Sequence, residues 1–224
     1  MEERVARVEA RMAGACARAG RPADSVRLVA VSKTRPPDQV DAAARCGLRR
    51  FGENKVQEAA AKIPLCSSAL EWHLVGHLQS NKVRLAVQWF SMIHSVDSAD
   101  LLQRLNRICE EEGRRMPVCL EVNVAGEGSK FGLAPDAVAG VLAAAHDCAR
   151  IEVVGLMAIP PAVEDPERAR GFFRTLRELR DRLRGETDYE LPELSMGMSH
   201  DFEIAIEEGA TFVRVGTDIF GERS

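Results

Sequence analysis

The stretch LVAVSKTRPP, residues 28–37, predicts the end of a buried strand followed by the start of a helix. Residues 28–31 are apolar, and the valines among them favour a strand. Lys33 stands at the end of this run, and Pro36 and Pro37 interrupt the strand and suit the first turn of a helix. A lysine at the mouth of a buried strand is either a solvated strand end or an amine available to a carbonyl group.

The same alternation of an apolar run and a helical pattern continues along the whole chain. The strand-like runs occupy residues 27–33, 48–54, 71–76, 92–97, 117–124, 152–159, 193–198 and 211–217. Their largely continuous apolar character is typical of a parallel sheet covered on both faces. Eight such units in 224 residues, preceded by one amphipathic helix, predict an α/β fold, a single (β/α)₈ TIM-type barrel domain over residues 1–224. The alternative is a doubly wound open sheet, which usually has a glycine-rich first turn that this chain lacks.

Several helix boundaries are also indicated. The first helix has Val5, Val8, Met12 and Ala15 on one face, with Gly20 as its stop, and the helix after the sixth run has Phe172, Leu176, Leu179 and Leu183, ending at Gly185. Ser98 is a candidate N-cap and Gly113 a stop for the helix after the fourth run. Pro135 suits the first turn of the helix after the fifth run.

Composition excludes several classes of protein. The 30 basic and 34 acidic residues give a formal net charge of −4, whereas a nucleic-acid-binding protein usually has a basic excess. No apolar run approaches the length of a membrane span, and the charged N-terminus lacks the apolar segment of a signal peptide. The six cysteines include no C-x-x-C pair, which favours a reducing compartment. We therefore expect a cytoplasmic protein that binds neither nucleic acid nor membrane.

The functional site is expected at the carboxyl ends of the barrel strands. The side chains predicted there are Lys33, Glu53, Asn54, His73, His94, Asn123, Met157, Ser195, Met196, Arg214 and Thr217. Two of the turns that follow, GMSHD (197–201) and RVGTDIFG (214–221), place small residues where backbone N–H groups can approach an anion. Because the loops after the last two strands of such barrels commonly bind phosphate, these turns predict a phosphate site.

The predicted phosphate site and Lys33 belong to neighbouring strands, because the first and last strands of a closed barrel are adjacent. An amine beside a phosphate site suits a phosphorylated aldehyde. Pyridoxal 5′-phosphate (PLP) is the commonest cofactor of this kind, and its aldehyde forms a Schiff base with lysine.

Motifs along nearly the whole chain agree with this interpretation. They are VSKTRP, FGENKVQEA, WHLVGHLQSNK, HSVDS, VNVAGEGSKFG, GLMAI, LSMGMSHDFEIAI and VRVGTDIFGER. With these motifs in this order, the chain resembles the family of pyridoxal phosphate homeostasis proteins, also called the YggS or PROSC family. The resemblance implies a fold-type III PLP-binding barrel, like the barrel domain of bacterial alanine racemase without its second, β-rich domain.

The resemblance also implies roles for individual residues. Lys33 matches the lysine that holds PLP as a Schiff base, and Asn54 matches a side chain near the phenolic edge of the cofactor. Ser199, Gly216 and Thr217 match the phosphate site, and Arg214 matches an arginine near either the ring nitrogen or the phosphate. Lys130 matches a second lysine close to the site, although a solvated loop lysine is the competing interpretation. Met196 packs either behind the cofactor ring or in the interior of the barrel.

Other candidate residues are assigned structural roles. His73, His77 and His94 come from separate strands or loops without the close spacing of metal ligands, so we predict no metal site. Glu53 is expected to orient its neighbours by hydrogen bonds at the strand end, and a general base or a surface acid are the alternatives.

Three functions remain open at this stage. Family members bind PLP without established turnover and are thought to buffer it and deliver it to apo-enzymes, and this non-catalytic role is our first hypothesis. A weak amino-acid racemase is the second, but a two-base racemase needs a partner opposite the lysine. The single tyrosine, Tyr189, precedes the seventh run and is therefore expected at the opposite rim of the barrel. A Schiff-base aldolase is the third. We expect a monomer, because the domain that builds the racemase dimer is missing.

Overall fold

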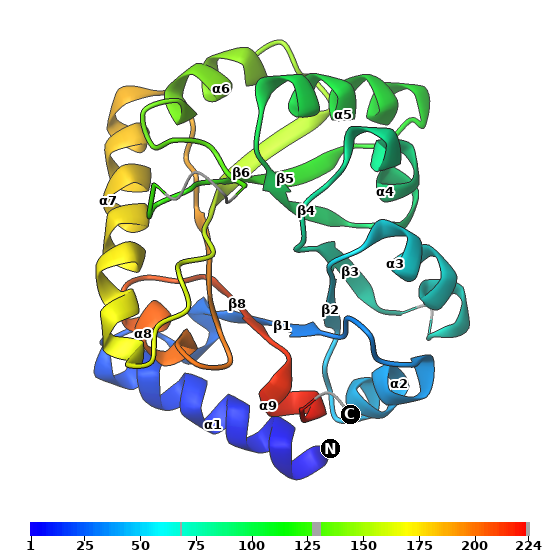
Figure 1. The fold of residues 1–224 in the computed structure, drawn as a ribbon, viewed down its shortest axis with the longest axis vertical. Coiled ribbons are helices and arrows are strands. Elements are labelled where there is room, and N and C mark those ends of the chain that lie inside the picture. Colours follow the sequence, from blue (N-terminus) through cyan, green and yellow to red (C-terminus); the bar gives the residue numbers. More distant parts are fainter. Residues whose placement is uncertain (68, 127–130, 223–224) are drawn as a thin grey trace.

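The computed structural model describes residues 1–67, 69–126 and 131–222. Within these residues, eight parallel strands close into a barrel in which each strand pairs with the next and β8 pairs with β1 (Figure 1). The strands are β1 (Arg27–Val31), β2 (Arg50–Glu53), β3 (Glu71–Leu74), β4 (Met92–Val96), β5 (Met116–Glu121), β6 (Ile151–Met157), β7 (Glu193–Met198) and β8 (Phe212–Val215). The predicted TIM-type barrel is confirmed, and each predicted apolar run overlaps one strand.

Helices form an outer ring around the barrel (Figure 1). They are α1 (Glu2–Arg18), α2 (Pro37–Arg45), α3 (Val56–Lys62), α4 (Val83–Trp89), α5 (Ala99–Glu111), α6 (Val138–Ala145), α7 (Arg170–Glu186), α8 (Phe202–Glu207) and α9 (Thr217–Phe220). Short 3₁₀ turns occupy Ala23–Ser25, Ile63–Leu65, Ser80–Lys82 and Pro166–Ala169. The extra N-terminal helix α1 packs against α8 and α9, which places it beside the last β/α units of the barrel.

Most predicted helix boundaries are confirmed, and two are wrong. The Oγ of Ser98 accepts a hydrogen bond from the N–H of Leu101 at 3.2 Å and caps α5, as predicted. Helix α6 begins at Val138, because the backbone after Pro135 first makes a turn. Helix α7 continues through Gly185 to Glu186. It buries Phe173 in place of the predicted Phe172, because Phe173 lies one helical turn before Leu176.

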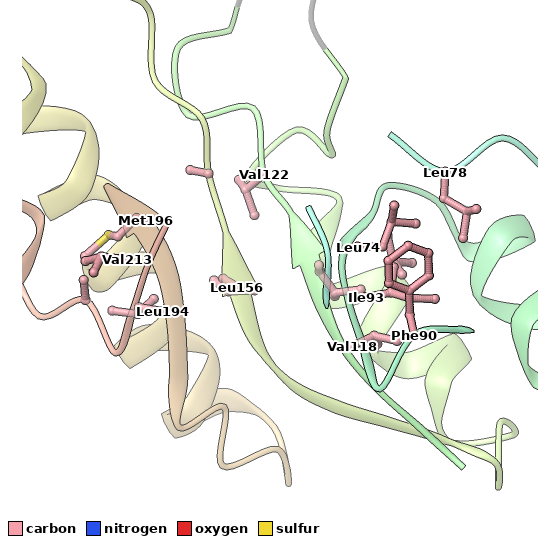
Figure 2. Packing of buried hydrophobic residues seen from close by; sticks show 14 of the residues in the cluster. Leu74, Leu78, Phe90, Ile93, Val118, Val122, Leu156, Leu194, Met196 and Val213 are labelled. Carbon is pink, nitrogen blue, oxygen red and sulfur yellow. The ribbon is translucent and has the colours of Figure 1, made fainter. Parts of the chain in front are cut away.

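Two layers of apolar packing hold the barrel together. The outer layer lies between the strands and the helices, where strand residues such as Leu74, Ile93 and Val118 pack outward (Figure 2). A smaller inner cluster fills the barrel itself, formed by Val29, Val75, Met92, Cys119, Met157 and Phe212. Because successive strand residues point to opposite faces, both layers draw on the same strands, which explains the continuous apolar runs.

Among the residues that the structure describes, no helix is both long enough and apolar enough to cross a membrane.

Candidate functional site

A cavity of about 380 Å³ opens at the carboxyl ends of the barrel strands. Its lining comes from the ends of β1, β2, β3, β6, β7 and β8 and from the segments that follow them, and consists of Val31, Lys33, Arg35, Asn54, Val75, Ile159, Met198, Ser199, His200, Arg214, Gly216 and Thr217. The volume and the mixture of apolar and convergent polar groups are typical of a small-molecule site.

Most residues predicted for the site lie together in this cavity. They are Lys33, Asn54, Ser199, Arg214, Gly216 and Thr217. Lys130 lies outside the described residues. Met196 is placed elsewhere: its side chain is fully buried in the outer core, beside Val213 and Leu194 in Figure 2.

A bulge in β7 explains why Met198 reaches the cavity and Met196 does not. The pairing of β7 with β8 shifts between Ser195 and Met198, and Gly197 has a φ of +91°. A Cβ on this glycine would lie 2.5 Å from the Cβ of Ala205, so the site accommodates no side chain here. Met196 follows the inward-pointing Ser195 and faces outward by the ordinary alternation of a strand. The extra residue breaks this alternation after Met196, so Met198 reaches the cavity.

Two turns form the polar wall at the ends of β7 and β8. The backbone N–H of Gly216 donates a hydrogen bond to the Oγ of Ser199 at 3.2 Å, which joins the two turns. Asp201 accepts a hydrogen bond from the N–H of Met198 at 2.7 Å and fixes the first turn. Burial raises the pKa of this carboxyl, and the hydrogen bond from Met198 opposes the increase. Gly216 also precedes α9, whose first N–H groups have no partner within the helix and can face an anion.

Arg214 is a buried cation at the floor of the cavity. Its guanidinium donates to the Oγ of Ser195 at 2.7 Å and to the carbonyl oxygen of Ala158 at 2.9 Å. Burial lowers its pKa to about 10, and the nearby Glu121 opposes this decrease, so the group stays charged at neutral pH. Burial in turn raises the pKa of Glu121 to about 7, although Arg214 favours its ionised form.

A chain of hydrogen bonds continues from Arg214 down the interior of the barrel. The Oγ of Ser195 lies 2.7 Å from Nδ1 of His94, and Nε2 of His94 lies 2.9 Å from Nδ1 of His73. Because a guanidinium only donates, the serine oxygen accepts from Arg214. The Nδ1 of His94 is the other partner of this oxygen among the described residues, so we assign the hydroxyl hydrogen of Ser195 to it. His94 then donates through Nε2 to His73, so both imidazoles carry their proton on Nε2.

His73 and His94 are both neutral. Burial lowers the pKa of His73 to about 3 and holds the pKa of His94 well below its usual value. His73 also lines a second cavity, of about 290 Å³, at the amino-terminal end of the strands. No group of three or more His, Cys, Asp or Glu side chains within the described residues is placed to hold a metal ion.

The sequence predicted the role of Glu53 but did not reveal the position of Arg35. Glu53 orients its neighbours, as predicted: it points away from the cavity and accepts hydrogen bonds from Ser32 and Lys62. Arg35 was missed, although it lines the cavity and donates to the carbonyl oxygens of Gly221 and Glu222. Its position in the same loop as Lys33 was the available signal.

Tyr189 lies away from the cavity. It belongs to the connection between α7 and β7 and packs against His146, with ring centroids 5.1 Å apart. Both residues line a separate hollow beside α6. No tyrosine is present among the described residues that line the cavity at the strand ends.

The geometry of this site agrees with comparisons of the whole chain. The family model for the N-terminal domain of alanine racemase matches residues 5–224. The chain belongs to this family. The match begins in α1 and includes all eight strands, so every lining residue of the cavity lies within the alanine racemase N-terminal domain.

Close relatives within the family have a consistent description. A pyridoxal phosphate homeostasis protein of Aquifex aeolicus is 45% identical over 222 residues, which cover 99% of this chain and 97% of the relative. Another from Pseudomonas aeruginosa is 44% identical over 225 residues, covering 99% of this chain and 95% of the relative. The structure of PipY from Synechococcus elongatus with PLP bound superposes with a TM-score of 0.88 at 39% identity, covering 98% of this chain and 99% of PipY.

Proposed function

We propose that this chain is a non-catalytic PLP-binding protein that holds the cofactor as a Schiff base on Lys33 and delivers it to PLP-dependent apo-enzymes. One observation carries the proposal: Lys33 and the joined turns of Ser199 and Gly216 line a single cavity. The relatives named as pyridoxal phosphate homeostasis proteins, and the PLP-bound structure of PipY, support the choice of this phosphorylated aldehyde.

The lining of the cavity fits PLP. Ser199 and the small residues at Gly216 and Thr217 suit the phosphate, because a hydroxyl and backbone N–H groups can approach its oxygens closely. Gly216 also stands in a tight place, because a Cβ there would come within 3.1 Å of the carbonyl oxygen of Val31. Apolar groups such as Met198 suit the faces of the ring. When bound, PLP supplies an electrophilic carbon to which an amine can bond covalently.

The charge of Arg214 bears on how strongly a bound ring could withdraw electrons. A guanidinium that only donates hydrogen bonds disfavours protonation of a pyridine nitrogen placed next to it, and an unprotonated ring is a weaker electron sink. Contact of Arg214 with the phosphate is the alternative. The distant position of Tyr189 removes the second base that a two-base racemase of the alanine racemase kind would use.

The remaining parts of the proposal concern the setting of the protein. Each of the six cysteines is a free thiol in the part of the chain that the structure describes, which supports a cytoplasmic location. A monomer is supported by the small number of large apolar side chains exposed among the described residues, namely Met1, Leu65, Phe131 and Ile159. Light scattering of the purified protein tests this oligomeric state.

A visible absorption spectrum tests PLP binding. Wild-type protein mixed with PLP should develop a yellow band that borohydride abolishes, and mass spectrometry should place the reduced adduct on Lys33. Lys33→Ala should not form the band, whereas Lys55→Ala, which removes an exposed lysine just before α3, should behave as wild type. A wild type that stays colourless overturns the proposal.

Two further measurements separate a carrier from a racemase. The loaded protein should restore activity to a PLP-dependent apo-enzyme, and it should leave the enantiomeric purity of L-alanine unchanged. Steady conversion of L-alanine to D-alanine would replace the carrier function with the racemase hypothesis.

A further inference from the structure

A cluster of buried charges lies directly behind Lys33, between β2 and α3. Glu53 ends β2 and is fully buried, and Lys62 ends α3 with only 6% of its surface exposed. Glu58, one helical turn before Lys62, completes the cluster. Burial of charged groups is unfavourable unless they are paired, and apolar residues of similar size often give equal or greater stability. The cluster therefore calls for a role beyond holding α3 on the barrel.

These side chains converge on Ser32 and Thr34, the residues on either side of Lys33. The Oε1 of Glu53 accepts hydrogen bonds from the Oγ of Ser32 at 2.6 Å and from the Nζ of Lys62 at 2.8 Å. The Nζ of Lys62 also donates to the carbonyl oxygen of Ser32 at 2.8 Å and to the Oε1 of Glu58 at 2.9 Å. The same Glu58 oxygen accepts from the N–H of Thr34 at 2.5 Å.

The segment held in this way is a strained turn. The N–H of Arg35 donates to the carbonyl oxygen of Ser32 at 3.0 Å, which closes a four-residue turn with Lys33 and Thr34 at its centre. Thr34 has a φ of +64°, a conformation that is costly for a β-branched residue and is usually given to glycine at this place in a turn. Such a conformation persists only where the surroundings determine it.

The second carboxylate oxygen of Glu53 is a further indication that this cluster has a special role. Its Oε2 is buried and has no hydrogen-bond partner among the described residues. Buried polar atoms without a partner are rare in proteins, and each calls for an explanation. Burial also raises the pKa of Glu53, and the hydrogen bond from Lys62 opposes this effect.

We propose that Glu53, Glu58 and Lys62 form a clamp that fixes the turn around Lys33 and so aims its amine into the cavity. None of the three lines the cavity, so they are positioning residues for the covalent chemistry of Lys33. The inference rests on the proposed function, because an amine must be aimed only if it meets an aldehyde. The clamp should therefore govern formation of the Schiff base and leave non-covalent binding of the phosphate and ring unaffected.

Two ligands separate these contributions. PLP reports on the covalent step, and deoxypyridoxine phosphate, which lacks the aldehyde, reports on non-covalent binding alone. In Lys62→Met, the rate of Schiff-base formation with PLP should fall by about tenfold or more, because small misplacements of a reacting group have effects of this size. Affinity for deoxypyridoxine phosphate should stay within about twofold of the wild type. Glu53→Gln, a milder change, should lower the rate in the same direction.

Rescue through the turn provides the sharpest test. Thr34→Gly in the Lys62→Met background should restore most of the rate, because glycine adopts a positive φ without support from a clamp. Two control variants make the same chemical changes outside the clamp. Lys55→Met replaces an exposed lysine near the start of α3, and Glu208→Gln removes the charge of a buried carboxylate in the remote ion pair with Arg174. Neither should change the rate by more than about twofold.

The outcomes distinguish this inference from the proposed function. Equal rates in Lys62→Met and wild type overturn the clamp, and so does an equal loss of affinity for both ligands, since that indicates general damage to the fold. Failure of Thr34→Gly to restore the rate also overturns it. If the wild type itself forms no bond that borohydride can trap, the proposed function fails instead.

Discussion

Replacing Ser195 with alanine should destabilise the protein far more than the loss of one small hydroxyl suggests. This side chain is fully buried and is the link between Arg214 and His94 inside the barrel. In Ser195→Ala, the guanidinium loses an acceptor and the Nδ1 of His94 loses a donor, with both groups still buried. A hydrogen bond to a charged group contributes about 1.5–3 kcal/mol, and an unsatisfied buried polar atom costs about 1–3 kcal/mol.

The two contributions together predict a loss of about 4 kcal/mol in the free energy of unfolding. For a chain of this length, that corresponds to a decrease in Tm of about 8–16 °C. Urea unfolding followed by circular dichroism measures the first value, and a thermal scan measures the second. An unchanged m value would show that the compactness of the denatured state is the same in both proteins.

Ser95 provides a matched control. It is also fully buried, but its Oγ makes a single neutral hydrogen bond, to the carbonyl oxygen of Gly76 at 2.7 Å. Ser95→Ala should therefore cost only about 1 kcal/mol. If Ser195→Ala costs no more than Ser95→Ala, the link between Arg214 and His94 does not stabilise the barrel.

Two other substitutions and one NMR measurement give further tests of the structure. Gly197→Ala should lower the free energy of unfolding by about 3 kcal/mol, because the positive φ is costly for alanine and the new Cβ would overlap its neighbours. Gly171→Ala in α7 should be neutral or slightly stabilising in the same urea experiment. Burial raises the pKa of Glu121 to about 7 in the folded state, so the unfolded state releases this proton at a lower pH. The free energy of unfolding should therefore fall as pH rises from about 4.5 to about 7. Glu121→Gln should flatten that part of the pH profile. ¹⁵N NMR of the imidazoles should show His73 and His94 as neutral Nε2–H tautomers, and protonation of either ring at pH 6 would contradict the hydrogen-bond directions.

Periodicity made the barrel predictable from sequence, because strands covered on both faces are continuous apolar runs. The same reasoning placed Lys33 and the last two turns at one rim, since strand direction and closure fix which ends meet. What it could not supply was local geometry. Met198 reaches the cavity through a bulge that depends on the approach of α8 to Gly197, which is a tertiary contact.

Charged residues in the interior were the other feature that sequence patterns concealed. Lys62 occupies the last turn of a helix, where a lysine is expected on the surface beside the helix carbonyls. Only the structure reveals that it turns inward to Glu53. His73 and His94 form a buried hydrogen-bonded pair. Their link to Arg214 through Ser195 requires the relative heights of side chains on separate strands, which a single sequence does not specify.

The clamp supports the backbone around Lys33, whereas the hydrogen-bond chain supports the side chain of Arg214. Lys33 follows the end of β1, where strand pairing no longer fixes the backbone, so charged side chains from α3 hold its turn. Arg214 lies within β8, so its backbone is already fixed and only the guanidinium needs support, which Ser195 supplies. Because the two clusters have no residue in common, their effects on the free energy of unfolding should add to within about 0.5 kcal/mol in the Lys62→Met, Ser195→Ala double variant. A larger coupling energy, measured by urea unfolding of both single variants and the double variant, would show that the two supports act as one unit.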